Sequence, residues 1–227
     1  DRIAKPDMSL DDGARLCLVS LDATSRSNVT VGPPFEVAVY ARDGMQLTQR
    51  LKLEADDCLR LVERTTDLCI HWLKCQLDRM DSPVAVLVLD DLAGMMSPAD
   101  AERFSVPHLK RIFDAFPGLL RIFHNDSPNK AVYTGLAGIG MDVFNFSHEI
   151  DAAEARSLLG PDVVLMGNIA PLDVLVRGTT DDVRRETGKL LDGLDRKGPL
   201  IVSPGGGVSP GTPIANLRQL MDAACGR

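Results

Sequence analysis

Short apolar runs rich in β-branched residues alternate along the chain with longer stretches in which apolar residues recur at helical spacing. The runs are continuously apolar, which is typical of strands that are buried on both faces of a parallel sheet. Strands that alternate with helices indicate βαβ units joined by right-handed crossovers. The six predicted strands are 29–31, 84–89, 119–123, 141–146, 163–166 and 200–202. Six parallel strands fit either an open doubly wound sheet or part of a closed barrel, and periodicity alone does not choose between them.

The stretches between these runs carry helix signals. An apolar stripe runs through 59–77. Ser97 followed by Pro98 predicts a helix start, with serine as the N-cap and proline at the first helical position. Asp151, three residues before a glutamate, has the form of an acidic cap for the next helix. The last two predicted helices cover 179–194 and 212–224.

Length and charge narrow the class of protein. The chain has 227 residues, enough for one sizeable domain. Its net charge of −7 argues against a nucleic-acid-binding surface. It shows neither a signal peptide nor an apolar run of membrane-spanning length, so we expect a cytoplasmic protein without a membrane partner. Its five cysteines are an odd number without CxxC spacing, which predicts free thiols of a reducing compartment. They are Cys17, Cys58, Cys69, Cys75 and Cys225.

Polar residues or glycines follow every predicted strand. Ligands bind at the carboxyl edge of parallel α/β sheets, because loops from many strands converge there. Six such groups in register therefore predict a site at this edge. The groups lie at 32–35, 90–94, 124–127, 145–149, 167–168 and 204–207.

His124 and Asp126 are the sharpest candidates. Alternate residues of an extended segment share a face, so both side chains can point to one centre. The functional interpretation is an acid–base pair or a pair of metal ligands. The alternative is a strand-end histidine that is hydrogen-bonded to a nearby carboxylate. Spacing alone favours this alternative, because His-x-Asp lacks the number of ligands that a zinc site needs.

Three other groups also carry two interpretations each. Asp90 and Asp91 end a buried strand and point to opposite faces, so at most one enters a barrel mouth, and the alternative is a loop cap. The backbone N–H groups of 205–207 could cradle an anion, or the three glycines could form a flexible loop. The pair 148–149 precedes a helix, which favours local capping.

In this order the motifs resemble the uroporphyrinogen decarboxylase superfamily, which contains the decarboxylase itself and the corrinoid-linked methyltransferases. The resemblance runs from about Val29 to the C-terminus. It rests on GPPFEVAVY at 32–40, VLDDLAG at 88–94, MSP at 96–98, the stretch 160–171, GT at 178–179, PGGG at 204–207 and GTP at 211–213. It implies a (β/α)8 TIM-type barrel, of which six C-terminal units are recognisable, as one domain over 1–227. We expect about two more strands on the N-terminal side, because an open barrel exposes unpaired edges.

Several residues of the family are replaced here. The decarboxylase has a histidine where this chain has Gly206, and its carboxylate-binding segment belongs to an N-terminal part outside this chain. The zinc methyltransferases have His-x-Cys after the third strand and a cysteine in the glycine loop. The corresponding residues here are His124, Asp126 and Gly206. The aspartate of the family's GNxDP motif is Ala170. Because both thiolates are missing, a cysteine-ligated zinc site is not expected.

The His-Asn-Asp pattern with its glycine loop is similar to the subgroup that acts on methoxylated or methylated donors. The resemblance implies transfer of a methyl group between a small substrate and the corrinoid of a separate protein docked over the barrel mouth. His124 and Asp126 would activate or protonate the atom that the methyl group leaves, or hold a hard metal ion as Lewis acid. The residues expected to bind substrate are Phe35, Tyr40, Asp90, Asn168, Gly205, Gly206 and Gly207.

Two other functions stay open. One is decarboxylation of a tetrapyrrole, a lyase reaction of porphyrin biosynthesis. It requires cationic groups for the substrate's carboxylates, and only Arg42 lies near a matching loop. The other is non-catalytic binding of a tetrapyrrole or corrinoid, which agrees with the loss of both thiolates and of the histidine. A homodimer is compatible with the sequence.

Overall fold

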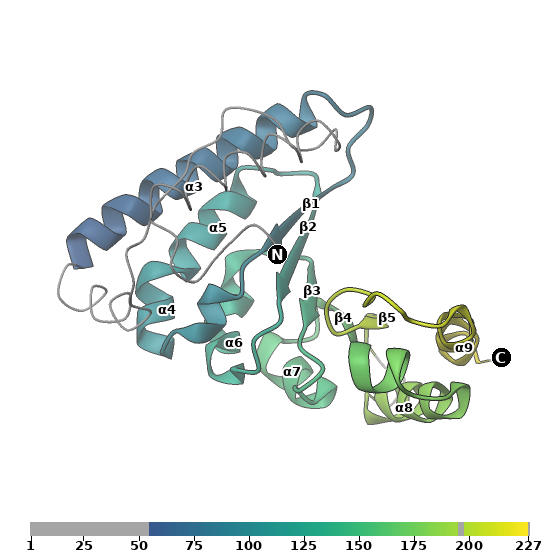
Figure 1. Cartoon of the computed structure of the whole chain (residues 1–227). Helices are drawn as coiled ribbons and strands as arrows, with labels where there is room; N and C mark the ends of the chain where they lie inside the picture. Colours follow the sequence, from purple (N-terminus) through teal and green to yellow (C-terminus); the bar gives the residue numbers. More distant parts are fainter. Residues whose placement is uncertain (1–54, 195–197, 227) are drawn as a thin grey trace, which may run out of the picture. The chain divides into compact units, whose positions relative to one another are not determined.

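Five parallel strands and the helices between them make up the residues that the structure, a computed structural model, describes: 55–194 and 198–226 (Figure 1). The strands are β1 (Ala85–Leu89), β2 (Leu120–Asn125), β3 (Val143–Phe146), β4 (Val164–Ile169) and β5 (Leu200–Pro204). They pair in the order β1-β2-β3-β4-β5, and every pairing is parallel. Five predicted strands are thus confirmed, and the sixth, 29–31, lies outside the described residues.

The strand order decides between the two architectures that periodicity left open. A doubly wound sheet reverses its strand order at a switch point, and helices then cover both faces. Here the order follows the sequence without reversal, and a helical segment separates each strand from the next. This is an α/β fold with the winding of a TIM-type barrel.

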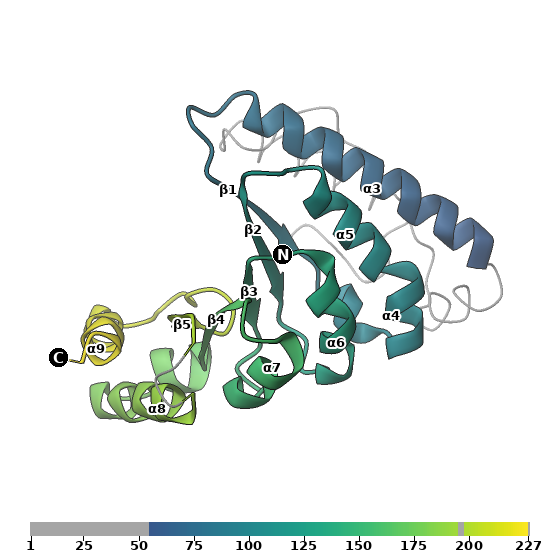
Figure 2. The same cartoon turned by 180° about the vertical axis from the view of Figure 1, so that it is seen from behind.

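The helices follow the predicted stretches, with one division. The segment after 97 forms two helices, and the second begins beside Pro107, whose ring nitrogen has no N–H to donate. The helices are α3 (Ala55–Leu77), α4 (Pro98–Phe104), α5 (Val106–Asp114), α6 (Tyr133–Leu136), α7 (Ala152–Leu159), α8 (Thr180–Gly193) and α9 (Ile214–Ala224). Short helical turns are η1 (Leu92–Met95), η2 (Lys130–Val132), η3 (Ala137–Ile139) and η4 (Pro171–Val176). Helix α6 packs against α7, and α8 packs against α9 (Figure 2).

The two faces of the sheet differ in burial. The side chains that face the helices are buried, among them Val86, Phe123, Phe144 and Leu165. On the opposite face Leu87, Leu89 and Ile201 expose 49%, 66% and 45% of their surface. The continuously apolar pattern predicted burial on both faces. That prediction holds for β3, whose four residues are all buried, and is wrong for β1 and β5.

Aromatic rings fill the layer between the sheet and the helices. Phe144 lies at their centre, with the ring of Phe123 stacked at a centroid distance of 5.8 Å and that of Phe146 at 6.0 Å. Tyr133 of α6 meets Phe144 edge-on at 5.1 Å. Burial raises the pKa of the Tyr133 hydroxyl well above its usual range. The packing holds the strands that end at the candidate site in fixed register.

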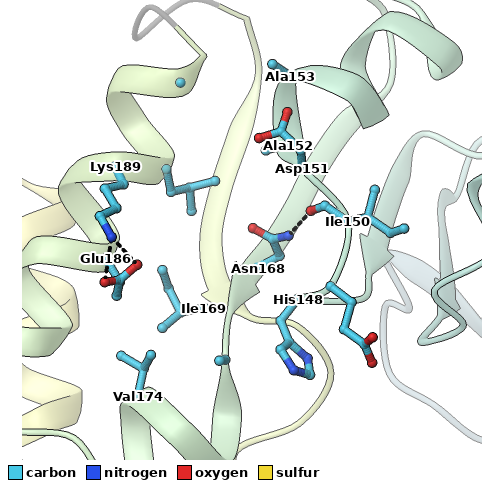
Figure 3. A pocket seen from close by; sticks show the side chains of 14 residues that line it. His148, Ile150, Asp151, Ala152, Ala153, Asn168, Ile169, Val174, Glu186 and Lys189 are labelled. Carbon is cyan, nitrogen blue, oxygen red and sulfur yellow. Dashed lines mark hydrogen bonds and ion pairs between the residues drawn. The ribbon is translucent and has the colours of Figure 1, made fainter.

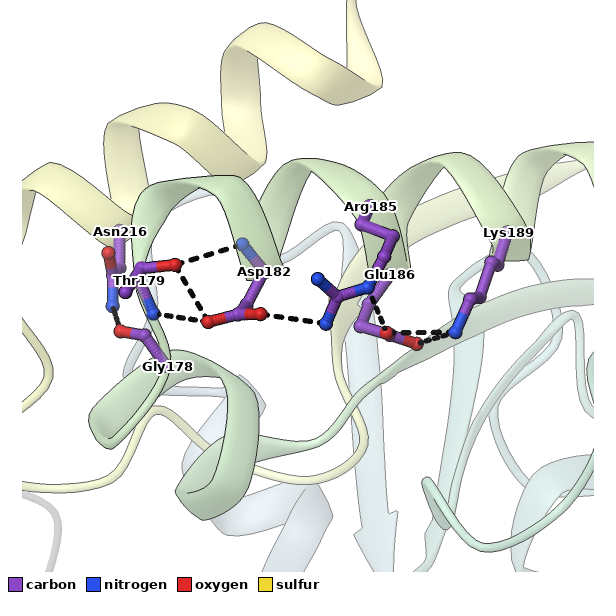
Figure 4. Close-up of polar contacts among 7 residues, drawn as sticks. All are labelled: Gly178, Thr179, Asp182, Arg185, Glu186, Lys189 and Asn216. Carbon is purple, nitrogen blue, oxygen red and sulfur yellow. Dashed lines mark hydrogen bonds and ion pairs between the residues drawn. The ribbon is translucent and has the colours of Figure 1, made fainter.

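The predicted N-caps are present. The Ser97 hydroxyl accepts a hydrogen bond from the N–H of Asp100 at 3.2 Å, and the Asp151 carboxylate accepts one from Glu154 at 2.9 Å. At the start of α8, the Thr179 hydroxyl accepts from the N–H of Asp182 at 3.2 Å (Figure 4). The Asp182 carboxylate accepts in return from the N–H of Thr179 at 2.9 Å. This reciprocal capping box satisfies two N–H groups that the helix itself cannot satisfy.

Replacing Thr179 by alanine should lower the free energy of unfolding by about 1 kcal/mol, because one N–H group at the helix start loses its acceptor. Urea unfolding measures this, with Thr180→Ala as the control inside the helix. Equal losses in the two variants would contradict the capping role.

Hydrogen bonds from Thr179 lower the pKa of Asp182 from 3.8 to about 2. The stabilisation from this carboxylate is therefore complete above pH 3.8 and is lost as the pH falls toward 2.

Candidate functional site

The carboxyl ends of β2 and β3 bring the central residues of the site together. His124 is aligned with Leu89 on one side and with Asn145 on the other. All three therefore lie on the face of the sheet that is turned away from the helices. The His124 side chain is 16% exposed. A nearly buried imidazole on this face, at the strand ends, is placed to meet a ligand.

His124 is held through both ring nitrogens. Nδ1 lies 2.6 Å from the side-chain oxygen of Asn145. Nε2 lies 3.9 Å from a carboxylate oxygen of Asp91, which is an electrostatic contact rather than a hydrogen bond. The same Asp91 oxygen accepts a hydrogen bond from the backbone N–H of Asp126 at 2.7 Å. The loop after β1 is thereby tied to the segment that follows β2.

Asp126 lies among several charged or polar groups. Its partial burial raises the pKa of the carboxyl group, and the negative charge of Asp91 adds to the rise. The imidazoles of His124 and His148 and the hydroxyl of Ser147 act in the opposite direction. The carboxyl group can therefore exchange a proton closer to neutral pH than an exposed aspartate. Together with His124 it offers acid–base chemistry.

Asp90 is a loop cap, and Asp91 is the carboxylate beside His124. One Asp90 oxygen accepts a hydrogen bond from the N–H of Leu92 at 2.8 Å. By strand alternation Asp90 points to the helix side, where its charge contributes to the raised pKa of the Cys69 thiol of α3, a rise caused mainly by burial. Burial also raises the pKa of Asp90. Asp91, and not Asp90, is thus the carboxylate beside His124, and substrate binding by Asp90 stays a prediction.

The glycine loop after β5 packs directly on the segment after β3. A Cβ atom on Gly205 would lie 2.5 Å from the backbone nitrogen of His148, too close for any side chain. Gly206 has a φ of +103°, which disfavours other residues, and a Cβ there would lie 3.4 Å from an Asp126 oxygen. Gly207 is exposed. The position that carries a histidine or cysteine in the relatives considered above therefore borders Asp126 here.

His148 belongs to this group as well. The N-cap of α7 is Asp151, so the expected capping role does not fall to His148. Its backbone lies under Gly205, and its imidazole is close enough to lower the pKa of Asp126. The sequence placed Asp91, Asn145, Ser147 and His148 among the polar groups at the strand ends but did not predict their contacts with His124 and Asp126. Only the strand register and the return of the glycine loop bring these residues together.

Asn168 lines a pocket of 270 Å³ beside the start of α7 (Figure 3). Its amide nitrogen donates to the carbonyl oxygens of Ile150 at 2.6 Å and Ser147 at 3.1 Å. The pocket also contains the ion pair between Glu186 and Lys189 of α8. Asn168 thus ties β4 to the segment after β3.

The described residues contain no group of three or more His, Cys, Asp or Glu side chains arranged to hold a metal ion. His124 and Asp126 supply two such side chains, fewer than that group requires. Cys58, Cys69, Cys75 and Cys225 are free thiols. The predicted substrate-binding residues Phe35 and Tyr40, and also Cys17 and Arg42, lie outside the described residues. None of the described helices combines the length and apolarity needed to cross a membrane.

The described strands are parallel, follow the order of the sequence and carry a polar cluster at their carboxyl ends. These features are typical of barrel-type α/β proteins. The sequence model of the uroporphyrinogen decarboxylase (URO-D) family matches residues 17–226, and the chain belongs to this family. This family membership confirms the resemblance seen in the motifs.

Individual relatives agree with this assignment. A uroporphyrinogen decarboxylase of Gloeobacter violaceus is 30% identical over 203 residues, which cover 83% of this chain and 55% of the relative. The chloroplastic uroporphyrinogen decarboxylase of Zea mays is 28% identical, with 86% and 51% covered. A solved methyltransferase structure from Methanosarcina mazei superposes with a TM-score of 0.69 at 18% identity, covering 79% of this chain and 52% of that one. The last likeness concerns the fold. The chain spans about half the length of these proteins.

Proposed function

We propose that this protein is a corrinoid-linked methyltransferase, which moves a methyl group between a small methoxylated or methylated substrate and the corrinoid of a separate protein. The observation that carries the proposal is the cluster of His124, Asp126 and Asp91 at the strand ends. The corrinoid would supply the cobalt that exchanges the methyl group. The chain's own residues would bind the small substrate and would donate and recover the proton.

A proton is what this reaction requires of the protein. An alkoxide, phenoxide or amide anion is a poor leaving group at neutral pH, so the heteroatom that loses its methyl group must gain a proton. His124 supplies an imidazole, which can donate or accept a proton, and Asp126 next to it has a raised pKa. Either group can give the proton to the heteroatom as the methyl group departs and recover it from water afterwards.

The charge of the site favours this substrate over a polyanionic tetrapyrrole. Asp91 and Asp126 place carboxyl groups beside His124. Two basic side chains that follow these loops along the chain are engaged in ion pairs, Lys130 with Glu154 at 2.6 Å and Arg177 with an aspartate of η4 at 2.9 Å. A substrate with many carboxylates needs free cations at the mouth. A small neutral or cationic methyl donor does not.

Decarboxylation of uroporphyrinogen is the second candidate, because the two relatives compared above carry that name at 30% and 28% identity. Within the described residues, the glycine at 206 occupies the place of the decarboxylase's histidine. The cations that such a substrate requires would then have to come from elsewhere in the protein.

Two assays run in parallel separate the candidates. The protein is incubated with a free corrinoid under reducing conditions and a panel of methoxylated and methylated donors, and methylation is followed by visible absorption. Separately, it is incubated with uroporphyrinogen, and loss of carboxyl groups is followed by chromatography. We expect donor-dependent corrinoid methylation and an intact tetrapyrrole. Loss of carboxyl groups without methylation would replace the proposal by the second candidate, and binding without either reaction would indicate a non-catalytic binder.

A further inference from the structure

Asn145 stands beside His124 on the neighbouring strand and is only 7% exposed. Its amide group has two N–H donors and one oxygen acceptor. The nitrogen donates to the carbonyl oxygen of Met166 at 2.8 Å and to that of Pro204 at 3.3 Å. Both donors are thus used by β4 and β5, and this fixes which end of the amide faces His124. The oxygen is turned toward the imidazole.

The orientation of Asn145 determines where the imidazole carries its proton. The amide oxygen lies 2.6 Å from Nδ1 of His124 and can only accept a hydrogen bond. Nδ1 must therefore be protonated for this contact to be favourable. A neutral imidazole has one N–H, so Nε2 keeps its lone pair. Nε2 is the ring nitrogen that faces Asp91 across 3.9 Å.

We propose that Asn145 is a positioning residue that holds neutral His124 in the Nδ1–H form and leaves Nε2 as the atom that exchanges protons with a ligand. In this exchange one N–H bond forms at Nε2 as one X–H bond of the ligand or of water breaks, and the reverse step returns the proton. The role of Nε2 in a reaction rests on the proposed function. The assignment of the tautomer does not, because it follows from the hydrogen bonds of Asn145.

The carboxamide is suited to this task because it is uncharged. A carboxylate at 145 would also accept from Nδ1, but it would favour the charged imidazolium and could not donate to Met166 and Pro204. A buried apolar side chain would leave Nδ1 without an acceptor. Asn145 therefore orients the ring without placing a charge beside it.

Nitrogen NMR of the full chain tests the proposal directly. The four histidines are labelled with 15N, spectra are recorded at a pH where the imidazoles are neutral, and the His124 signals are assigned by their loss in His124→Gln. We expect Nδ1 to show the shift of a protonated nitrogen and Nε2 that of an unprotonated one. In Asn145→Ala the two shifts should move toward each other, which is the signature of mixed tautomers.

Asn125→Ala is the matched control. Asn125 is also buried and lies on β2, but its amide bonds to the backbone of Asp90 at 2.7 Å and Ser127 at 3.1 Å. This variant should keep the His124 pattern of the wild type. A protonated Nε2 in the wild type overturns the proposal, as does an unchanged pattern in a folded Asn145→Ala variant. If circular dichroism shows that Asn145→Ala does not fold, the wild-type spectrum decides. A failed methyl-transfer assay would leave these spectra and the tautomer unaffected.

Discussion

Replacing His124 by alanine should lower the rate of methyl transfer by on the order of 10² or more, because general acid–base help of this kind contributes about 10²–10⁴ in rate. The fold should remain intact, since the His124 side chain lies on the sheet face opposite to the aromatic core. The measurement is the initial rate of donor-dependent corrinoid methylation, with circular dichroism as the check on folding.

Two further variants sharpen this result. Asp126→Asn should lower the rate of methyl transfer less than His124→Ala does if the carboxyl group only orients the imidazole. It should lower the rate about as much if the carboxyl group supplies the proton itself. His71→Ala, on an exposed part of α3, should leave the rate unchanged. Full activity of a folded His124→Ala variant would show that the imidazole has no part in the chemistry.

Replacing Phe144 by alanine should have the largest effect on stability, a loss of about 3–5 kcal/mol in the free energy of unfolding. The ring is fully buried and contacts Phe123, Tyr133 and Phe146, so its removal opens a cavity at the centre of the aromatic layer. Such a loss is a large fraction of the stability of an ordinary domain. Chemical denaturation followed by circular dichroism measures it.

Ile201→Ala is the control for this prediction. Ile201 also lies in a strand, but 45% of its surface is exposed, and its truncation should change stability by less than about 1 kcal/mol. Comparable losses in the two variants would mean that the opposite face of the sheet contributes as much as the aromatic layer. The exposed fractions of the two side chains would then not account for their contributions to the free energy of unfolding.

The elements of the fold were predictable because their signals are local. A continuous apolar run such as 84–89 fixes a strand within a few residues, and Ser97 and Asp151 mark helix starts through hydrogen bonds to residues three positions away. Burial of the strands was less predictable. The apolar pattern of β1 and β5 is that of an interior strand, although their outer side chains are exposed among the described residues.

The site was predictable only in part, because its contacts join residues that are far apart in the sequence. The spacing of His124 and Asp126 predicts that they share a face. Asp126 directly follows the last residue of β2, and His124 is close enough to lower its pKa. Alternation places Asp90 and Asp91 on opposite faces, but only the pairing of Leu89 with His124 shows that Asp91 is the one on the His124 face. Asn145 is separated from His124 by 21 residues, and only the strand register reveals their contact.

Strand β2 shows how a chain of this kind can diverge in chemistry while its architecture stays constant. Phe123 and Asn125 point to the helices and carry packing and loop attachment, whereas His124 points to the opposite side. Because side chains that pack against the helices alternate with side chains of the opposite face, a substitution at 124 or 126 can change the reaction without disturbing the aromatic layer. Evolution can therefore explore new substrates at the strand ends one position at a time, with the stability of the barrel wall held nearly fixed.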